Sequence, residues 1–157
     1  MLDFFSPRVT TLRRRRDVAG LVHVLENGRT RARRAAANAL ITMPDPRSAE
    51  PLVRALRADD PLLRLNAALA LGELRGPRRE YHEIVEPLTD ALRDESAPVR
   101  AMAASALGRR KEPRAVAALA SLLEDRSELV RMTAAAVLRD FDDPRAVEAL
   151  TSRGFPA

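Results

Sequence analysis

A leucine that recurs at nearly constant spacing sets the register of an internal repeat along the whole chain. The intervals are 31, 36, 31 and 31 residues, and the leucines are Leu21, Leu52, Leu88, Leu119 and Leu150. Each of the first four is followed by a second leucine after 19 residues, a proline after 25 and an arginine after 12, the arginines being Arg33, Arg64, Arg100 and Arg131. Self-similarity at a period of about 20 to 50 residues is typical of solenoids and other repeat folds. The register therefore predicts the architecture strongly but does not indicate which molecule the protein binds.

Each repeat is predicted to form two short helices. In the third copy, apolar residues follow the 3, 4 spacing of a helix face twice, first at Val85, Leu88, Ala91 and Leu92 and then at Val99, Met102 or Ala103, Ala106 and Leu107. Between these two runs, Asp94 and Ser96 offer capping oxygens, and Pro98 suits the first turn of a helix. No strand pattern competes. Helices this short are marginal alone in water, so each must be held by its neighbours.

The chain is expected to form one all-α repeat domain over residues 17–157. Its repeats would span about 17–44, 45–79, 80–111 and 112–142, with a partial repeat at 143–157. Residues 1–16 would form a basic N-terminal capping segment with Leu12 facing inward. Phe4 and Phe5 would cover the open flank of the first hairpin, the alternative being an anchor inserted into a partner. At the other end, Phe155 is expected to fold back on the last helix.

Two stretches carry a family resemblance. "EPLTDALRDESAPVRAMAASALG" at residues 86–108 and "AVAALASLLEDRSELVRMTAAAVL" at 115–138 resemble the HEAT-like repeat family, in particular the short bacterial and archaeal form that includes the phycobilin lyases. The resemblance covers about residues 17–152, although the first copy departs from the pattern at Asn27 and Gly28. It implies a right-handed α-α superhelix, an armadillo-like solenoid of about four helical hairpins plus terminal capping helices. It also implies a stabilising ladder between hairpins, formed by Arg64, Arg100 and Arg131 with Asp59, Asp94 and Asp125.

The same resemblance places the second helix of each hairpin on the concave face, where the positions that the repeat leaves free are available for binding. In the first copy these positions include Arg34, Ala35 and Asn38. The second copy is unusually rich in leucine, and exposed apolar patches rimmed by charge mark protein interfaces. The predicted partner-binding residues are Leu62, Leu65, Asn66, Leu69, Met102, Ser105, Arg109 and Met132. For Leu62 and Leu65 the alternative is packing on a neighbouring hairpin.

Positive charge is concentrated at the amino-terminal end. Residues 1–47 hold ten arginines against four acidic residues, whereas residues 48–157 hold 17 basic and 18 acidic residues. The predicted basic patch comprises Arg13, Arg14, Arg15, Arg16, Arg29, Arg31 and Arg34. Such a patch attracts phosphate at low salt, so attachment to nucleic acid is an alternative function, beside an acidic protein partner or a solvated basic cap. The chain has only four phenylalanines and one tyrosine, which argues against stacking on unpaired bases.

An insertion lengthens the connection between the second and third copies. It reads "GPRREYHEI" at residues 76–84 and presents Tyr81 and His82. Insertions in repeat proteins tend to fall on one face, and tyrosine is a common interface anchor. The insertion is therefore either a contact element or a longer loop without a role, and the sequence favours neither.

Catalysis, cofactors and metals are not expected. The chain has no cysteine and two histidines, and no glycine-rich phosphate loop or zinc-ligand spacing. Iron-binding HEAT-type hydroxylases need several His-Glu pairs, and His82 with Glu83 is a single pair. The hypothesis is a non-enzymatic scaffold or adaptor that holds a protein partner, with an accessory or chaperone subunit of an enzyme as a further alternative. Without a signal peptide or a membrane-spanning run, we expect a soluble cytoplasmic protein, of undetermined oligomeric state.

Overall fold

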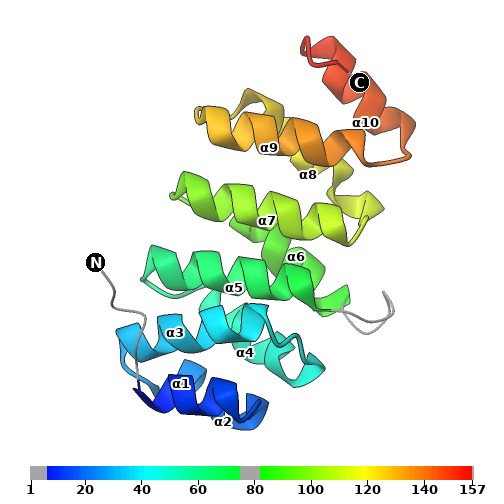
Figure 1. Ribbon diagram of the computed structural model, residues 1–157. Helices are drawn as coiled ribbons and strands as arrows, with labels where there is room; N and C mark the ends of the chain where they lie inside the picture. Colours follow the sequence, from blue (N-terminus) through cyan, green and yellow to red (C-terminus); the bar gives the residue numbers. More distant parts are fainter. Residues whose placement is uncertain (1–6, 75–81, 157) are drawn as a thin grey trace. The chain divides into compact units, whose positions relative to one another are not determined.

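The computed structural model describes residues 7–74 and 82–156, with side chains for 8–74 and 83–156. The chain divides into two compact units, Met1–Ile84 and Val85–Ala157. All regular secondary structure in the described residues is helical, as Figure 1 shows, which confirms the all-α expectation. The predictions for Phe4, Phe5, Tyr81 and the side chain of His82 lie outside the described residues.

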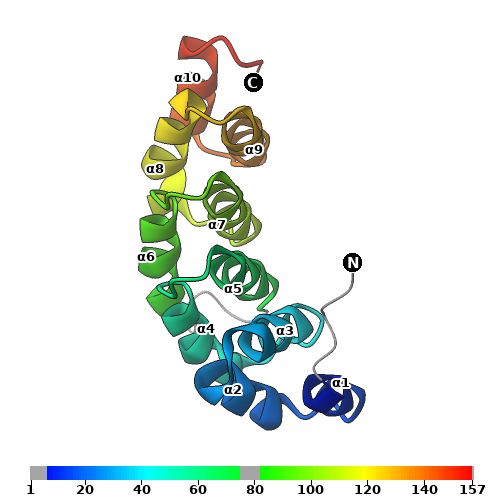
Figure 2. The same cartoon turned by 90° about the vertical axis from the view of Figure 1, so that its left-hand side faces the viewer.

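The first unit contains a capping helix and two helical hairpins. Helix α1 spans Pro7–Arg14, and the first hairpin joins α2 (Val18–Asn27) to α3 (Thr30–Ile41). A short 3₁₀ turn, η1 (Pro46–Ser48), leads into the second hairpin of α4 (Ala49–Ala55) and α5 (Pro61–Glu73). Within this unit α2 and α4 form one layer and α3 and α5 form the other, with α3 packed along α5 (Figure 2).

The second unit repeats the arrangement. Helix α6 (His82–Ala91), which crosses the division between the units, is followed by α7 (Ala97–Arg109). The turn η3 (Pro113–Ala115) leads into α8 (Val116–Ser121), which continues as η4 (Leu122–Glu124) before α9 (Glu128–Arg139). Helix α10 (Pro144–Ser152) packs on α8 and α9. Helices α7 and α9 pack against each other as α3 and α5 do in the first unit.

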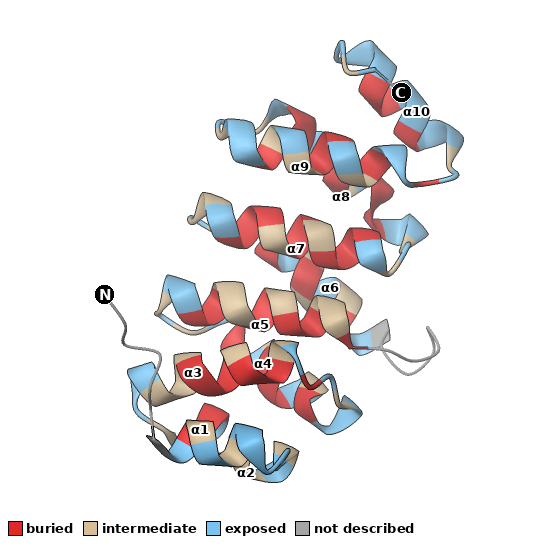
Figure 3. Ribbon diagram, viewed as in Figure 1, coloured by how far each residue is buried: buried red, intermediate tan, exposed pale blue. Residues whose placement is uncertain are grey.

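The leucines that define the repeat form the core of both units. Those at the start of each copy are fully buried, and those 19 residues later are at most 1% exposed: Leu21, Leu52, Leu88, Leu119 and Leu150, then Leu40, Leu71, Leu107 and Leu138. Each buried leucine contributes about 1.5–3 kcal/mol relative to an exposed one. Figure 3 shows buried positions running along α3 and α5 in the first unit and along α7 and α9 in the second. The register found in the sequence is thus a register of core positions.

Alanine and glycine allow the second helices to approach closely. Ala103, Ala104 and Ala106 on α7 are buried, as are Ala134 and Ala135 on α9, whereas Ala136 is exposed. A Cβ placed on Gly108 would lie 2.6 Å from Cγ1 of Val137. Because valine is stiff about χ1, that methyl group cannot move aside freely. Gly108 is therefore required by the packing of α7 on α9.

Both ends of the described chain are covered by short elements. Val9 on α1 is 4% exposed, and Leu12 lies so close to Gly20 that any Cβ on Gly20 would clash with it. Helix α1 thus covers the flank of α2 and α3, with Leu12 facing inward as predicted. At the other end, the Phe155 amide donates to the Leu150 carbonyl at 3.0 Å, and Arg139 Nε donates to the Pro156 carbonyl at 2.8 Å. The residues after α10 fold back in this way. No helix in the described part of the chain is long and apolar enough to cross a membrane.

Candidate protein-binding groove

The arginine at the start of each second helix satisfies the backbone of the loop before it. Arg64 Nη1 donates to the carbonyls of Ala58 and Asp59 at 2.9 and 3.1 Å, and Arg100 Nη1 donates to those of Asp94 and Glu95 at 2.8 and 3.1 Å. Arg131 Nη1 donates to the Asp125 carbonyl at 2.8 Å. Helix ends leave carbonyl groups without intrahelical partners, and these guanidinium groups satisfy them. Each of these arginines therefore fixes the loop of its own hairpin, and the ladder between hairpins that the resemblance implied is present in the bond of Arg100 to Asp125.

Two carboxylates connect successive hairpins within the units. In the second unit, Arg100 binds both carboxylate oxygens of Asp125, and the two side chains are 6% and 9% exposed. In the first unit, Arg34 on α3 binds both carboxylate oxygens of Asp60, which also accepts the Leu62 amide and so caps α5. Asp59, the expected ladder residue of this copy, contributes its carbonyl instead. The prediction that the Asp59 carboxylate belongs to the ladder was wrong, because in this loop Asp60 is the aspartate that faces α3 and binds Arg34.

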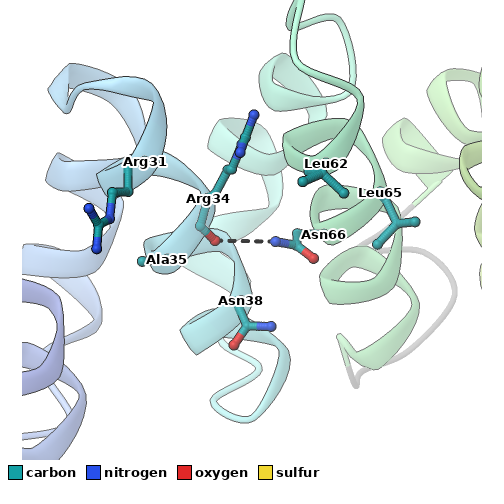
Figure 4. A pocket seen from close by; sticks show the side chains of 7 residues that line it. All are labelled: Arg31, Arg34, Ala35, Asn38, Leu62, Leu65 and Asn66. Carbon is teal, nitrogen blue, oxygen red and sulfur yellow. Dashed lines mark hydrogen bonds between the residues drawn. The ribbon is translucent and has the colours of Figure 1, made fainter. Parts of the chain in front are cut away.

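A groove lies between α3 and α5 in the first unit. Its volume is about 470 Å³, and its lining comprises Arg31, Arg34, Ala35, Asn38, Leu62, Leu65 and Asn66. In Figure 4 the Arg34 guanidinium and the Asn38 amide lie at opposite ends, and Leu62 and Leu65 come from α5. Pockets that hold drug-sized ligands measure about 300–1,000 Å³. The groove therefore has room for a few side chains of a partner.

The polar groups of the groove are partly fixed by the protein itself. Asn66 Nδ2 donates to the Arg34 carbonyl at 3.3 Å, which joins the two walls. The Asn38 side chain makes no hydrogen bond with the described residues and keeps both its donor and its acceptor for a ligand. Asp60 orients Arg34 through Nε and Nη2 and leaves Nη1 unused. The groove therefore offers hydrogen-bond donors and acceptors beside an apolar wall.

The ion pair beside the groove shifts the pKa values of both of its members, Asp60 and Arg34. Burial alone would raise the pKa of Asp60, but hydrogen bonds from the Arg34 side chain and the Leu62 amide outweigh it, so this pKa lies below its ordinary value. The hydrogen bond to Asp60 raises the pKa of Arg34. Asp60 and Arg34 therefore stay charged at neutral pH.

The groove brings together residues that the sequence assigned to two separate sites. Leu62, Leu65 and Asn66 belong to the predicted partner-binding set, and Arg31 and Arg34 to the predicted basic patch. Leu62 is 53% exposed, so the alternative of packing on a neighbouring hairpin is wrong for this residue. Leu65 is half-buried. Charge and apolar surface are thus adjacent in one groove.

The other predicted partner-binding residues lie outside the groove lining. Leu69 is half-buried on α5. The rest belong to the second unit: Met102 and Ser105 are half-buried on α7, Arg109 is exposed on α7, and Met132 on α9 is 53% exposed. Leu129, one turn before Met132, is 52% exposed and was missed. For these residues a role in binding stays a prediction.

The remaining residues of the predicted basic patch are exposed. Arg13 and Arg14 end α1, Arg15 and Arg16 follow in the turn, and Arg29 precedes α3. None of these five side chains forms an ion pair or hydrogen bond with the described residues. They form a positively charged surface on the first unit.

The repeat register contains a signal for the groove that the sequence reasoning did not use. Arg31 and Leu62 stand ten residues after Leu21 and Leu52, and Arg34 and Leu65 stand thirteen after them. The groove is therefore lined by the same two positions of successive copies. Arg31 was assigned only to the basic patch because its register position was not compared between copies.

No cluster of three or more potential metal ligands occurs in the part of the chain that the structure describes. His23 is exposed on α2, and its ring nitrogen Nδ1 lies 3.4 Å from Nδ2 of Asn27. This histidine therefore has a local partner on its own helix.

Comparison with known proteins agrees with the repeat geometry. A sequence profile of HEAT repeats matches residues 18–79 and 85–153, which is most of the chain. The chain belongs to the HEAT-repeat family. None of the curated proteins compared with this HEAT-repeat chain matches it.

Solved structures resemble this HEAT-repeat protein at low sequence identity. The complex of CpcE and CpcF of phycocyanin lyase from Nostoc sp. PCC7120 has a TM-score of 0.71 at 22% identity, covering 82% of this chain and 85% of that chain. A designed armadillo repeat protein in complex with the peptide (KR)4 has a TM-score of 0.69 at 19% identity, covering 93% and 74%. Armadillo repeat proteins designed for modular peptide recognition have a TM-score of 0.68 at 21% identity, covering 92% of this chain and 77% of that chain. These likenesses establish an armadillo or HEAT-like repeat fold.

Proposed function

We propose that this protein is a non-enzymatic scaffold or adaptor that holds a segment of a partner protein in the groove between α3 and α5. The observation that carries the proposal is the exposure of Leu62 beside Arg31 and Arg34 in a groove of about 470 Å³. An exposed leucine next to arginine resembles the core and rim of a protein interface.

The apolar wall favours a protein segment as the ligand. Leu62 and Leu65 offer side chains that lose contact with water when a partner binds, and each apolar Å² removed from water contributes about 25 cal/mol. The amide groups of Asn38 and Asn66 complement the donors and acceptors of a peptide main chain. The peptide named with one of the similar designed proteins shows that an armadillo-type repeat can hold such a ligand.

Co-purification tests this function with two matched variants. The groove variant carries Leu62→Glu and Leu65→Glu. The control carries Leu129→Glu and Val147→Glu, which replace two apolar side chains that are 52% and 48% exposed and lie outside the predicted partner-binding set. Lysate of the native host is used with and without nuclease treatment, and the captured material is washed at low and at high salt.

We expect a protein that wild type and the control retain at high salt and that the groove variant loses. The circular dichroism of all three proteins must show that they are folded. Retention of the same protein by the groove variant overturns the assignment to this groove. Cytoplasmic location and the absence of enzymatic activity stay predictions.

Attachment to nucleic acid is a second candidate, favoured by the five exposed arginines of the amino-terminal surface. Affinity for phosphate falls steeply as salt rises, in proportion to the number of phosphates neutralised. Replacing Arg13, Arg14, Arg15 and Arg16 by glutamine would therefore abolish nuclease-sensitive capture at low salt. The Leu62→Glu plus Leu65→Glu variant would retain such capture.

A further inference from the structure

The groove between α3 and α5 has a charge of one sign. Two of its seven lining residues are arginines, and none is acidic. Asp60, which is bonded to Arg34, is 10% exposed in its side chain. A ligand in the groove therefore meets two guanidinium groups and no acidic lining residue.

We propose that the segment bound in this groove carries an acidic side chain next to a large apolar side chain. This inference rests on the proposed function and names the chemical class of its partner. The acidic side chain binds at Arg31 and Arg34, and the apolar side chain packs on Leu62 and Leu65.

The Arg34 guanidinium is held in position to bind a carboxylate of a ligand. Its bonds to Asp60 use Nε and Nη2, fix the plane of the guanidinium and leave the Nη1 donors unused, while the side chain is 40% exposed. A guanidinium held in place loses less side-chain freedom when it forms another hydrogen bond. Arg34 can therefore bind a second carboxylate while Asp60 remains in place.

The start of α3 reinforces the positive charge at the Arg31 end. Arg31 is the second residue of α3 and is exposed. The first turn of α3 holds no acidic residue, and no side chain caps it. A helix has a partial positive charge at its amino end, which adds to that of Arg31.

The repeat register places the two kinds of contact at equivalent positions. Arg31 and Arg34 on α3 correspond to Leu62 and Leu65 on α5, because each pair stands ten and thirteen residues after the first leucine of its copy. Neighbouring second helices therefore offer cations on one wall and leucines on the other. A segment lying between them makes both contacts only if it carries both kinds of side chain.

The inference predicts the opposite charge preference from that of a similar designed protein. The peptide bound by that designed armadillo protein is (KR)4. In the present groove such a peptide would be placed against Arg31 and Arg34, and like charges repel. The peptide (KR)4 is therefore a suitable negative probe.

A selection from a random 12-residue peptide library displayed on phage tests the inference. The immobilised full chain is the bait, and peptides that also bind the Leu62→Glu plus Leu65→Glu variant are removed. Enriched peptides are synthesised with Glu or Asp, with the corresponding Gln or Asn, and compared with (KR)4 by fluorescence anisotropy. We expect enrichment of acidic residues adjacent to Leu, Ile, Phe or Met, weaker binding of the amide versions and no binding of (KR)4.

Two arginine variants localise the effect. Arg31 lines the groove, whereas Arg29, two residues earlier, does not, and both side chains are exposed. The variants are Arg31→Gln and Arg29→Gln. Arg31→Gln should weaken the binding of an acidic peptide about threefold to fivefold, which is within the contribution of an exposed ion pair. Arg29→Gln should leave the affinity for this peptide nearly unchanged. The amide version of the peptide should bind both variants and wild type equally.

The outcomes separate this inference from the proposed function. Groove-dependent peptides that are neutral or basic overturn the inference and leave the proposed function intact. A selection that yields no groove-dependent peptide counts against both. An acidic peptide that responds equally to Arg31→Gln and Arg29→Gln overturns the inference, because its charge then acts through the general field of the first unit.

Discussion

Arg100 on α7 binds the Asp125 carboxylate through two hydrogen bonds, from Nε at 2.8 Å and from Nη2 at 2.7 Å. The Nη1 group of the same side chain donates to the carbonyls of Asp94 and Glu95. One buried guanidinium thus joins the loop of its own hairpin to the loop of the next hairpin.

Removing the Asp125 carboxylate should destabilise the second unit strongly. Asp125→Ala leaves Arg100 with a buried charge and no acid, which costs about 3–5 kcal/mol. Arg145, whose side chain is 62% exposed and paired with Asp143, provides the control, since Arg145→Ala should cost at most about 1 kcal/mol. Urea unfolding followed by circular dichroism measures both. Equal losses for the two variants would contradict the assigned importance of the buried pair.

The same carboxylate should make stability depend on pH. The hydrogen bond from Arg100 lowers the pKa of Asp125 in the folded protein below the ordinary value near 3.8. Its contribution is therefore fully present above that ordinary value and is lost as pH falls through the lower, folded value. The difference in unfolding free energy between wild type and Asp125→Asn should be greatest near neutral pH and should shrink below about pH 4. Urea titrations at neutral and acidic pH measure the trend, and a constant difference would refute it.

The close contact of Gly108 with Val137 gives a prediction about packing. Alanine at Gly108 improves helix propensity by about 1 kcal/mol, but its methyl group would overlap Val137, and overpacking typically costs about 1–3 kcal/mol. We expect Gly108→Ala to lower the unfolding free energy. Combining it with Val137→Ala should restore part of that loss in a double-mutant cycle. Strictly additive effects would show that the contact is not the cause.

Asp60 combines two roles that two substitutions can separate. Its carboxylate accepts the Leu62 amide at 3.1 Å as the cap of α5 and also pairs with Arg34. Asp60→Asn keeps an oxygen for the cap and loses the charge, whereas Asp60→Ala loses both. The alanine variant should therefore be less stable than the asparagine variant by about 1 kcal/mol, a typical value for a helix cap. Thermal unfolding distinguishes the two, and identical stabilities would exclude capping as a significant contribution.

The sequence predicted the helical repeat well because the core repeats with it. Leu52 and Leu88 mark equivalent positions that are fully buried, and burial is what hydrophobic periodicity reports. The hairpins follow from the same signal, whereas the inward position of Leu12 and the folded-back chain near Phe155 were expected because the ends of a repeat stack need to be covered. Charge pairs were less predictable, since a shift of one residue in a loop exchanges Asp59 for Asp60.

The groove was predicted only in parts. Leu62 and Leu65 were assigned to partner binding because they exceed the number of leucines that one helix face can bury. Arg31 was assigned only to a basic patch, and Arg34 was assigned both to that patch and to the free concave positions of the first copy, because net charge along the sequence does not reveal which helix packs beside which. The packing of α3 along α5 joins the two groups, and this contact between successive copies requires the structure.

The register of the groove separates the residues that keep the fold from those that meet a ligand. Leu40 and Leu71 are buried at one set of positions, whereas the exposed residues Arg31 and Leu62 occupy another set that the core does not use. Substitutions at the second set can therefore accumulate with little loss of folding stability. A protein built in this way can change its partner during evolution by altering a few surface positions in single copies, and proteins with the same backbone can diverge widely in what they bind.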